Sequence, residues 1–150
     1  MKKPIPLPSQ ERLRELFDYE PETGKFERIK GKKERPIAKG YRCSVVDGIT
    51  YTTHRLIWRF VTGEDPLELE VDHRDRNKSN NVWSNLRKGT HKQNLENRGA
   101  KGFSWNKRLG KWQAYIKHNG EKFHLGTFDC AMCAHLAYMD KKKELHSWGY

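Results

Sequence analysis

Hydrophobic and polar positions follow two different periods along the chain. Apolar residues three or four apart mark three stretches: ERLRELFDY after Ser9, HRLIWRFVT before Gly63 and CAMCAHLAYMDKKKEL after Asp129. HKQNLENR after Thr90 is also read as a helix. Ser, Thr and Asp favour helix starts and Gly favours the position beyond a helix end, so these flanking residues predict the limits of four helices. In the last helix the expected packing face is Met132, Leu136 and Met139.

A period of two marks the predicted strands. GYRCSVV and ITYTTH flank Asp47-Gly48, which is a strong signal for a type I′ hairpin, and KFERI reads as a strand after a turn. Two short strands, Glu68–Asp72 and NLRKGT, surround the loop DRNKSNN. Further on, GFSWNK, KWQAYIKH and KFHLGTF are joined at Leu109-Gly110 and Asn119-Gly120, which predicts three consecutive antiparallel strands.

These elements predict an α+β protein built from two small parts. We expect a first domain over residues 1–98, with an irregular arm at 1–8, a linker at 99–102, and a second domain over 102–150 made of three antiparallel strands and one helix. Only 35% of the 150 residues are hydrophobic and 33% are charged, so two modest cores are favoured over one large core.

Charge narrows the class of partner. The formal net charge is +11 and the pI is about 9.7, so the surface attracts polyanions such as nucleic acid. A membrane partner is disfavoured, because the start MKKPIPLPSQERL lacks the apolar run of a secretory signal and no apolar stretch approaches the roughly 20 residues of a spanning helix. We therefore expect a cytoplasmic protein.

The three cysteines make neither an even disulfide framework nor a four-thiolate zinc set, which favours a reducing compartment. Cys130, Cys133 and His135, together with Cys43, could suggest zinc. The favoured interpretation places Cys133 on the packing side of its helix as a buried free thiol.

The Asp-His pair at 72–73 carries the candidate chemistry. Hydrolysis of a phosphodiester needs a base that takes a proton from water and a cation that binds the phosphate. Neutral His suits the first task, and hard divalent cations prefer oxygen ligands such as Asp carboxylate and Asn carbonyl. Neighbouring strand residues point to opposite faces, so Asp72 can face a metal while His73 faces water, and Asn94 on the following helix can return another oxygen ligand.

This stretch resembles the HNH endonuclease family, in its phage homing branch, through Asp72-His73, Asn80-Asn81, Asn85-Leu86, Gln93-Asn94 and Asn97. The resemblance implies a ββα-metal core at about 68–98 with an N-terminal extension at 9–63, because FDYEPETGKFERI and GYRCSVVDGITYTTHRLIW are similar to the front half of the same family. It implies that His73 is the general base, that Asp72 and Asn94 bind Mg²⁺ or Mn²⁺, and that Asn85 buttresses His73. His73 precedes Asn85 by 12 positions and Asn94 by 21, as that branch requires.

Other polar residues of this region have less defined roles. Arg55 is expected to contact phosphate and His54 to pack at a helix start. His91 either contacts phosphate or simply occupies the first helical turn, and the second reading is favoured. Asn97 either bonds the facing strand or supports the site, and we do not assign it as a ligand.

The segment from Gly102 to Met139 resembles the plant APETALA/ethylene-response DNA-binding domain, through Gly110-Lys111-Trp112, Leu125-Gly126-Thr127-Phe128 and two helix alanines. Residues 98–150 hold ten Lys or Arg and four Asp or Glu, a net charge of +6. Trp112, Ala114 and Ile116 are expected to face the helix, which leaves the other face of the sheet for the major groove. The candidate DNA contacts are Trp105, Lys107, Arg108, Lys111, Gln113, Tyr115, Lys117, Lys122 and His124.

The sequence therefore predicts a homing-type DNA endonuclease, phage-encoded and acting in the host cytoplasm. We expect a monomer on double-stranded DNA that nicks one strand with a single metal ion. The alternative is a sequence-specific DNA-binding regulator with a catalytically inactive HNH domain. An RNA-binding module is a third interpretation, which the absence of an aromatic RNA-platform motif disfavours.

Overall fold

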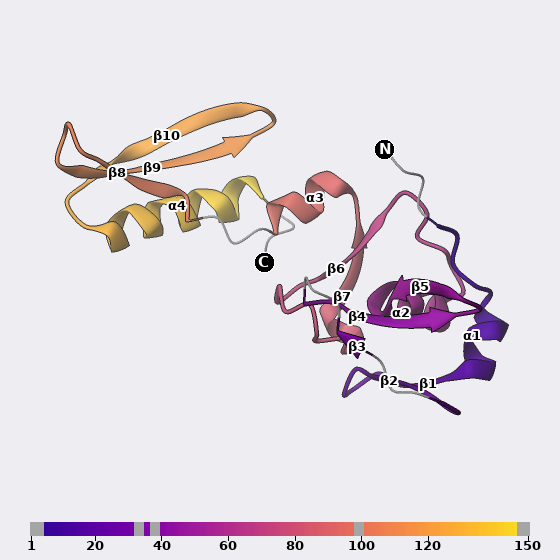
Figure 1. Cartoon of the computed structure of the whole chain (residues 1–150). Helices are drawn as coiled ribbons and strands as arrows, with labels where there is room; N and C mark the ends of the chain where they lie inside the picture. Colours follow the sequence, from indigo (N-terminus) through magenta and orange to yellow (C-terminus); the bar gives the residue numbers. More distant parts are fainter. Residues whose placement is uncertain (1–4, 32–34, 37–39, 98–100, 147–150) are drawn as a thin grey trace. The chain divides into compact units, whose positions relative to one another are not determined.

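The computed structural model describes residues 5–31, 35–36, 40–97 and 101–146. The chain forms two compact units, Met1–Asn94 and Leu95–Tyr150, hereafter the N-terminal and C-terminal units. Both combine helices with small antiparallel sheets, which confirms the predicted α+β class (Figure 1). The division falls after Asn94, whereas the predicted linker was 99–102, of which residues 99 and 100 lie outside the described residues.

The N-terminal unit contains three small antiparallel sheets in its described part. Its elements are α1 (Gln10–Leu16), β1 (Phe17–Glu20), β2 (Lys25–Arg28), β3 (Arg35–Pro36), β4 (Arg42–Val46), β5 (Ile49–Thr52), α2 (Thr53–Thr62), β6 (Glu70–His73), a 3₁₀ turn (Trp83–Asn85), β7 (Leu86–Gly89) and the part of α3 (His91–Glu96) up to Asn94. The sheets are β1–β2, β3–β4–β5 and β6–β7.

Local sequence signals account for several of these boundaries. The Ser9 hydroxyl accepts a hydrogen bond from the Arg12 N–H at 3.2 Å, so it caps α1 as predicted. The predicted hairpin turn joins β4 to β5, and both Asp47 and Gly48 have positive φ, as a type I′ turn requires. Gly63 ends α2 in the left-handed conformation, which confirms its role as a C-cap.

One hydrophobic core joins the N-terminal extension to the strands that carry the Asp-His pair. Leu13, Leu56 and Ile57 are fully buried in this core, and Val71 of β6 and Leu86 of β7 belong to it. Because side chains of α1, α2 and β1–β2 pack in the same core, the extension fixes the position of the β6–β7 hairpin.

The C-terminal unit has the three strands and one helix that the sequence predicts. β8 (Phe103–Asn106), β9 (Lys111–His118) and β10 (Glu121–Phe128) form an antiparallel sheet in the order β10-β9-β8, and α4 (Ala131–Leu145) runs across one of its faces (Figure 1). Ala114 and Ile116 of β9 are buried, which confirms the predicted helix-facing side of that strand.

The face of α4 that packs differs from the predicted one. Met132 and Leu136 are 65% and 55% exposed, whereas the buried residues are Ala134, Tyr138 and Lys142. The prediction followed the largest apolar side chains, but the helix instead presents a small residue and an aromatic ring to the sheet. Gly102 explains part of this choice, because a Cβ there would overlap the Tyr138 ring.

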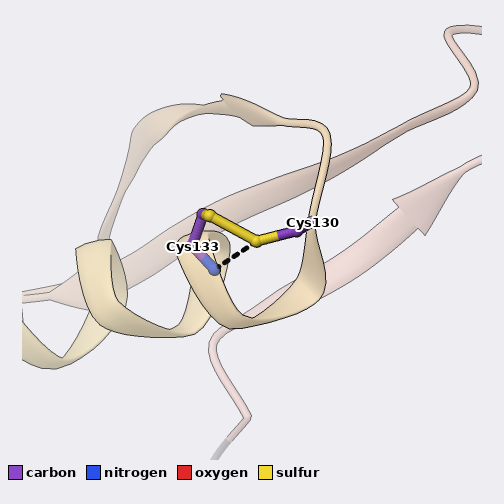
Figure 2. Close-up of a disulfide and its surroundings, with 2 residues drawn as sticks. All are labelled: Cys130 and Cys133. Atoms are coloured by element: carbon purple, nitrogen blue, oxygen red, sulfur yellow. Dashed lines mark hydrogen bonds between the residues drawn. A yellow bond between two sulfur atoms is a disulfide. The ribbon is translucent and has the colours of Figure 1, made fainter.

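The start of α4 also differs from the prediction. Cys130 is the N-cap and its sulfur accepts a hydrogen bond from the Cys133 N–H, while Asp129 pairs with Lys111 at 3.0 Å. Cys130 and Cys133 are disulfide-bonded and exposed, so Cys133 is not the buried free thiol that was expected (Figure 2). A spacing of three residues at the first helical turn brings their Cα atoms to 5.4 Å, which is within the range for a disulfide.

None of the helices in the described ranges has the length and apolar character needed to cross a membrane.

Candidate active site

Strand β6 separates the Asp-His pair into two environments. Val71 and His73 are buried on one face, whereas Glu70 and Asp72 on the other face are partly exposed. β6 pairs antiparallel with β7, with Asp72 opposite Arg87 and His73 opposite Leu86. The alternation gives the base candidate and the metal-ligand candidate opposite orientations, as the sequence predicts.

His73 is only 2% exposed and is surrounded by polar and aromatic groups. Its Nε2 lies 3.0 Å from the side-chain oxygen Oδ1 of Asn81. The His54 ring meets it edge to face at a centroid distance of 4.9 Å, and the Tyr41 ring lies at 6.2 Å. Polar and aromatic contacts therefore hold the imidazole, rather than hydrophobic packing alone.

The groups around His73 have displaced pKa values. Burial lowers the pKa of His54 to about 3, with smaller contributions from His73 and Arg55, so His54 is a neutral ring at physiological pH. Burial also raises the pKa of Tyr41, assisted by the negative charges of Asp72 and Glu70. The Tyr41 hydroxyl is therefore neutral, and its pKa depends in part on the charges of the carboxylates on β6.

Asp72 forms an ion pair with Arg87 across the hairpin. Arg87 Nη2 lies 3.3 Å from Asp72 Oδ2, and the two side chains are 7% and 15% exposed. Burial lowers the pKa of Arg87, although the hydrogen bond and the charge of Asp72 oppose this shift. Breaking such a pair leaves a buried charge uncompensated, so Asp72 contributes to folding as well as to any ligand binding.

Asn94 approaches β6 from α3. Its Nδ2 donates a hydrogen bond to Glu70 Oε2, and His91 Nδ1 lies 2.8 Å from Glu70 Oε1. Glu70 and Asp72 occupy alternate positions of β6 and share its partly exposed face. The helix thus brings an amide to the face that carries two carboxylates.

These donors fit a hard divalent cation. Two carboxylates and one carboxamide are the oxygen ligands that Mg²⁺ and Mn²⁺ prefer, with water completing the shell. Among the described residues, no group of three or more His, Cys, Asp or Glu side chains is arranged to hold a metal ion.

Asn85 fastens the loop that follows His73. Its side chain accepts from the Asp75 N–H at 3.0 Å and donates to Asp75 Oδ1 at 2.9 Å and to the Asn80 carbonyl at 2.8 Å. Its backbone carbonyl accepts from the Arg74 N–H at 2.8 Å. Burial acts to raise the pKa of the Asp75 carboxyl, but hydrogen bonds from Asn80, the Asn77 N–H and Asn85 hold this pKa below its usual value. The carboxamides of this loop therefore replace the hydrogen bonds of regular secondary structure.

Three residues of this site were absent from the sequence-based assignments, namely Glu70, Tyr41 and Asn81. Glu70 could have been found from strand alternation, since it precedes Asp72 by two positions. Asn81 was noted only as part of the family resemblance, and its burial at 3% exposure has no sequence signal. Tyr41 and His73 are far apart in the chain and meet only through the fold.

The candidate DNA contacts of the C-terminal unit divide between two faces of its sheet. Directly paired residues share a face, and the pairs Lys117–Lys122 and Tyr115–His124 put four candidates on the face opposite α4, together with Gln113. Lys122 Nζ lies 4.1 Å from the centre of the Tyr115 ring. We call the side formed by Gln113, Tyr115, Lys117, Lys122 and His124 the open face.

The remaining candidates lie elsewhere. Trp105 pairs with Trp112, which places it on the helix side of the sheet, where it is 47% exposed. Lys107 and Arg108 lie in the exposed β8–β9 turn, and Lys111 forms the ion pair with Asp129 described above. In the N-terminal unit, Arg55 is only 23% exposed, and its Nη2 lies 3.7 Å from Asp65 Oδ1.

Comparisons with known proteins place part of the chain in a family. Residues 51–96 match the family model for HNH endonucleases, and this span contains Asp72, His73, Asn85 and Asn94. The chain is also similar to the solved structure of the HNH homing endonuclease I-HmuI, described for DNA binding and cleavage, with 27% identity over 79% of this chain and 75% of that chain, and a TM-score of 0.45. No curated protein matches the chain. The predicted HNH resemblance is thus confirmed for residues 51–96, and the plant-type resemblance stays a prediction.

Proposed function

We propose that the chain is a metal-dependent DNA endonuclease of the homing type, in which the N-terminal unit cuts and the C-terminal unit holds the DNA. The observation that carries this proposal is the arrangement on β6. A segment that matches the HNH endonuclease model has a buried, hydrogen-bonded imidazole on one face of β6 and the carboxylates of Glu70 and Asp72 on the other.

In the proposed reaction, His73 takes a proton from a water molecule as its oxygen attacks phosphorus. The new P–O bond forms as the bond to the 3′ oxygen breaks, leaving 5′-phosphate and 3′-hydroxyl ends. Asp72 and Asn94 would hold a Mg²⁺ or Mn²⁺ ion, which would supply positive charge for the phosphate and the leaving oxygen. Asn85 holds the loop beside His73, and Arg87 holds the Asp72 carboxylate in place until the ion binds.

The C-terminal unit supplies affinity in this proposal. Its open face carries two lysines beside a tyrosine and a histidine, and such groups bind phosphates and base edges in the major groove. A monomer with one cutting site then nicks one strand of a duplex.

The test uses purified protein, supercoiled plasmid carrying the presumptive target, and Mg²⁺ or Mn²⁺. We expect conversion to the nicked circle by the wild-type protein and a fall of about 10²–10⁴-fold in rate for His73→Ala, with DNA binding unchanged in a gel-shift titration. Binding without nicking in any divalent ion would instead identify a DNA-binding regulator and overturn the proposal.

A further inference from the structure

Asn81 occupies an unusual place for a carboxamide. It is 3% exposed, and its side chain lies against the imidazole of His73, with Oδ1 3.0 Å from Nε2. Buried carboxamides are uncommon and almost always have hydrogen-bond partners. The neighbouring loop residue Asn77 is exposed, and its side-chain oxygen accepts hydrogen bonds from the N–H and the hydroxyl of Ser79 in the same loop.

The chemistry of this contact sets the position of the proton on His73. A carboxamide oxygen only accepts hydrogen bonds, so a hydrogen bond from the ring to Asn81 Oδ1 requires the hydrogen on Nε2. A neutral imidazole has one N–H, and its lone pair is then on Nδ1. The contact therefore selects one of the two neutral tautomers and one orientation of the ring.

Asn81 is itself held by the β1–β2 hairpin of the N-terminal extension. The Tyr19 hydroxyl donates a hydrogen bond of 2.8 Å to the backbone carbonyl of Asn81, and both groups are buried. The Trp83 N–H donates to the Pro21 carbonyl at 2.9 Å. At the hairpin turn, a Cβ on Gly24 would overlap the backbone of Asn81 and Val82, so the turn lies directly against this segment.

We propose that Asn81 is a positioning residue that fixes the tautomer and orientation of the His73 ring, and that the β1–β2 hairpin acts through Tyr19 to hold Asn81 in place. This inference rests on the proposed endonuclease function and adds to it a role for the N-terminal extension. The proton on Nε2 stays with the Asn81 hydrogen bond, and Nδ1 accepts the proton from water.

Nuclear magnetic resonance of ¹⁵N-labelled protein tests the inference without an activity assay, because the ring nitrogen shifts report which nitrogen carries the hydrogen. We expect the wild type to show His73 as the Nε2–H tautomer at alkaline pH. Asn81→Asp keeps an acceptor oxygen and should keep that signature. Asn81→Leu has a similar volume but no acceptor and should give a mixture of tautomers. Asn77→Ala is the matched control and should behave as wild type.

Cleavage kinetics separate positioning from simple stability. We expect Asn81→Leu to lower kcat by about 10–100-fold with KM little changed, and Asn81→Asp to recover most of the rate. Tyr19→Phe, which keeps the ring and removes the hydroxyl, should lower kcat less than Asn81→Leu and should broaden or shift the His73 signals. Should Asn81→Leu fail to fold, the Tyr19→Phe and Asn81→Asp measurements still decide whether Asn81 positions the His73 ring.

Two results would overturn the inference. One is an unchanged His73 tautomer in Asn81→Leu, and the other is a loss of activity that follows melting temperature alone in every variant. Normal kcat and normal His73 signals in Tyr19→Phe would show that the β1–β2 hairpin does not act on His73 through Tyr19. Failure of the proposed function looks different, because the wild type would then cleave nothing while the tautomer measurement would still give its answer.

Discussion

The two units use polar residues in opposite ways. In the N-terminal unit the polar groups of the site are bonded to one another, and several of them are buried, namely His73, Asn81 and Arg87, the partner of Asp72. In the C-terminal unit Lys117, Lys122 and His124 are exposed on the open face, and the buried polar residues Asn97, Lys142 and His146 are outside that face. Chemistry at one phosphorus needs fixed geometry, whereas attraction to a phosphate backbone needs only charge at the surface.

The comparison implies different responses to substitution. Removing a buried partner leaves its neighbour unsatisfied and changes both stability and rate, while removing an exposed lysine changes affinity in proportion to the charge lost.

Gly102→Ala should destabilise the C-terminal unit by about 2–4 kcal/mol, because the new Cβ overlaps the Tyr138 ring and the residue has a φ of +71°. Hydrogen exchange should show lost protection in β8–β10 and α4, while the N-terminal unit keeps its protection. Gly110→Ala is the control, since its φ is also positive but its Cβ meets open space, and it should cost about 1 kcal/mol. Equal losses in both variants would exclude the Tyr138 contact as the cause.

Asn94→Ala should weaken Mn²⁺ binding and lower kcat, each by about 10–100-fold, because it removes one oxygen ligand from α3. Electron paramagnetic resonance of free Mn²⁺ measures the binding directly, and plasmid nicking measures the rate. Lys92→Ala, an exposed position on the same helix, is the control and should bind Mn²⁺ normally. Normal Mn²⁺ affinity in Asn94→Ala would show that this carboxamide is not a ligand.

Stability should fall on acidification because His54 is buried and neutral. Its folded pKa is about 3 and its ordinary value is 6.5, so between these values the unfolded chain binds a proton that the folded chain does not. The free energy of unfolding then decreases as pH falls through this window, with a limiting slope of about 1.4 kcal/mol per pH unit. Urea titrations should show a flatter pH dependence for His54→Gln than for the wild type.

The control for this pH dependence is His124→Gln, which alters an exposed side chain. It should leave the slope of the wild type unchanged. A His54→Gln variant with the wild-type slope would assign the acid sensitivity to other groups.

The smallest effect is expected from the open face. Replacing both Lys117 and Lys122 by Ala should reduce the slope of log K against log salt by about 1.8 and leave kcat at saturating protein unchanged. Fluorescence anisotropy with labelled duplex measures this slope. Lys141→Ala with Lys143→Ala removes the same charge from α4 and should change the slope less. Equal slopes for the two pairs would show that net charge, and not the open face, controls binding.

Sequence reasoning recovered most of the fold because its signals are local. The caps Ser9 and Gly63, the Asp47-Gly48 turn and the three C-terminal strands each depend on a few neighbouring residues. The packing face of α4 was predicted wrongly. The Tyr138 ring packs against Gly102, where the absence of a side chain leaves room for it, and Gly102 is 36 positions away in the sequence. Side-chain size alone led to the prediction that Met132 and Leu136 pack on the sheet, but both are exposed.

The candidate site shows the same limit. Asp72, His73, Asn85 and Asn94 could be predicted as site residues because a familiar motif spaces them along one stretch, and this stretch lies within the matched HNH segment. The residues that hold them could not, because Tyr19, Tyr41 and His54 come from other elements and reach His73 or Asn81 through tertiary contacts. The pairing of Asp72 with Arg87 depends on the β6–β7 register, which a short loop-bearing hairpin does not reveal in sequence.

The central claim is that His73 acts on a DNA phosphate beside a metal held by Asp72 and Asn94. It is tested most directly by single-turnover cleavage of an end-labelled duplex at saturating protein, with and without Mg²⁺, for the wild type and His73→Ala. The account predicts Mg²⁺-dependent cleavage that leaves 5′-phosphate and 3′-hydroxyl ends, slowed by about 10²–10⁴-fold in the variant at equal DNA occupancy. Equal cleavage by both proteins, or cleavage that persists without any divalent ion, would contradict it.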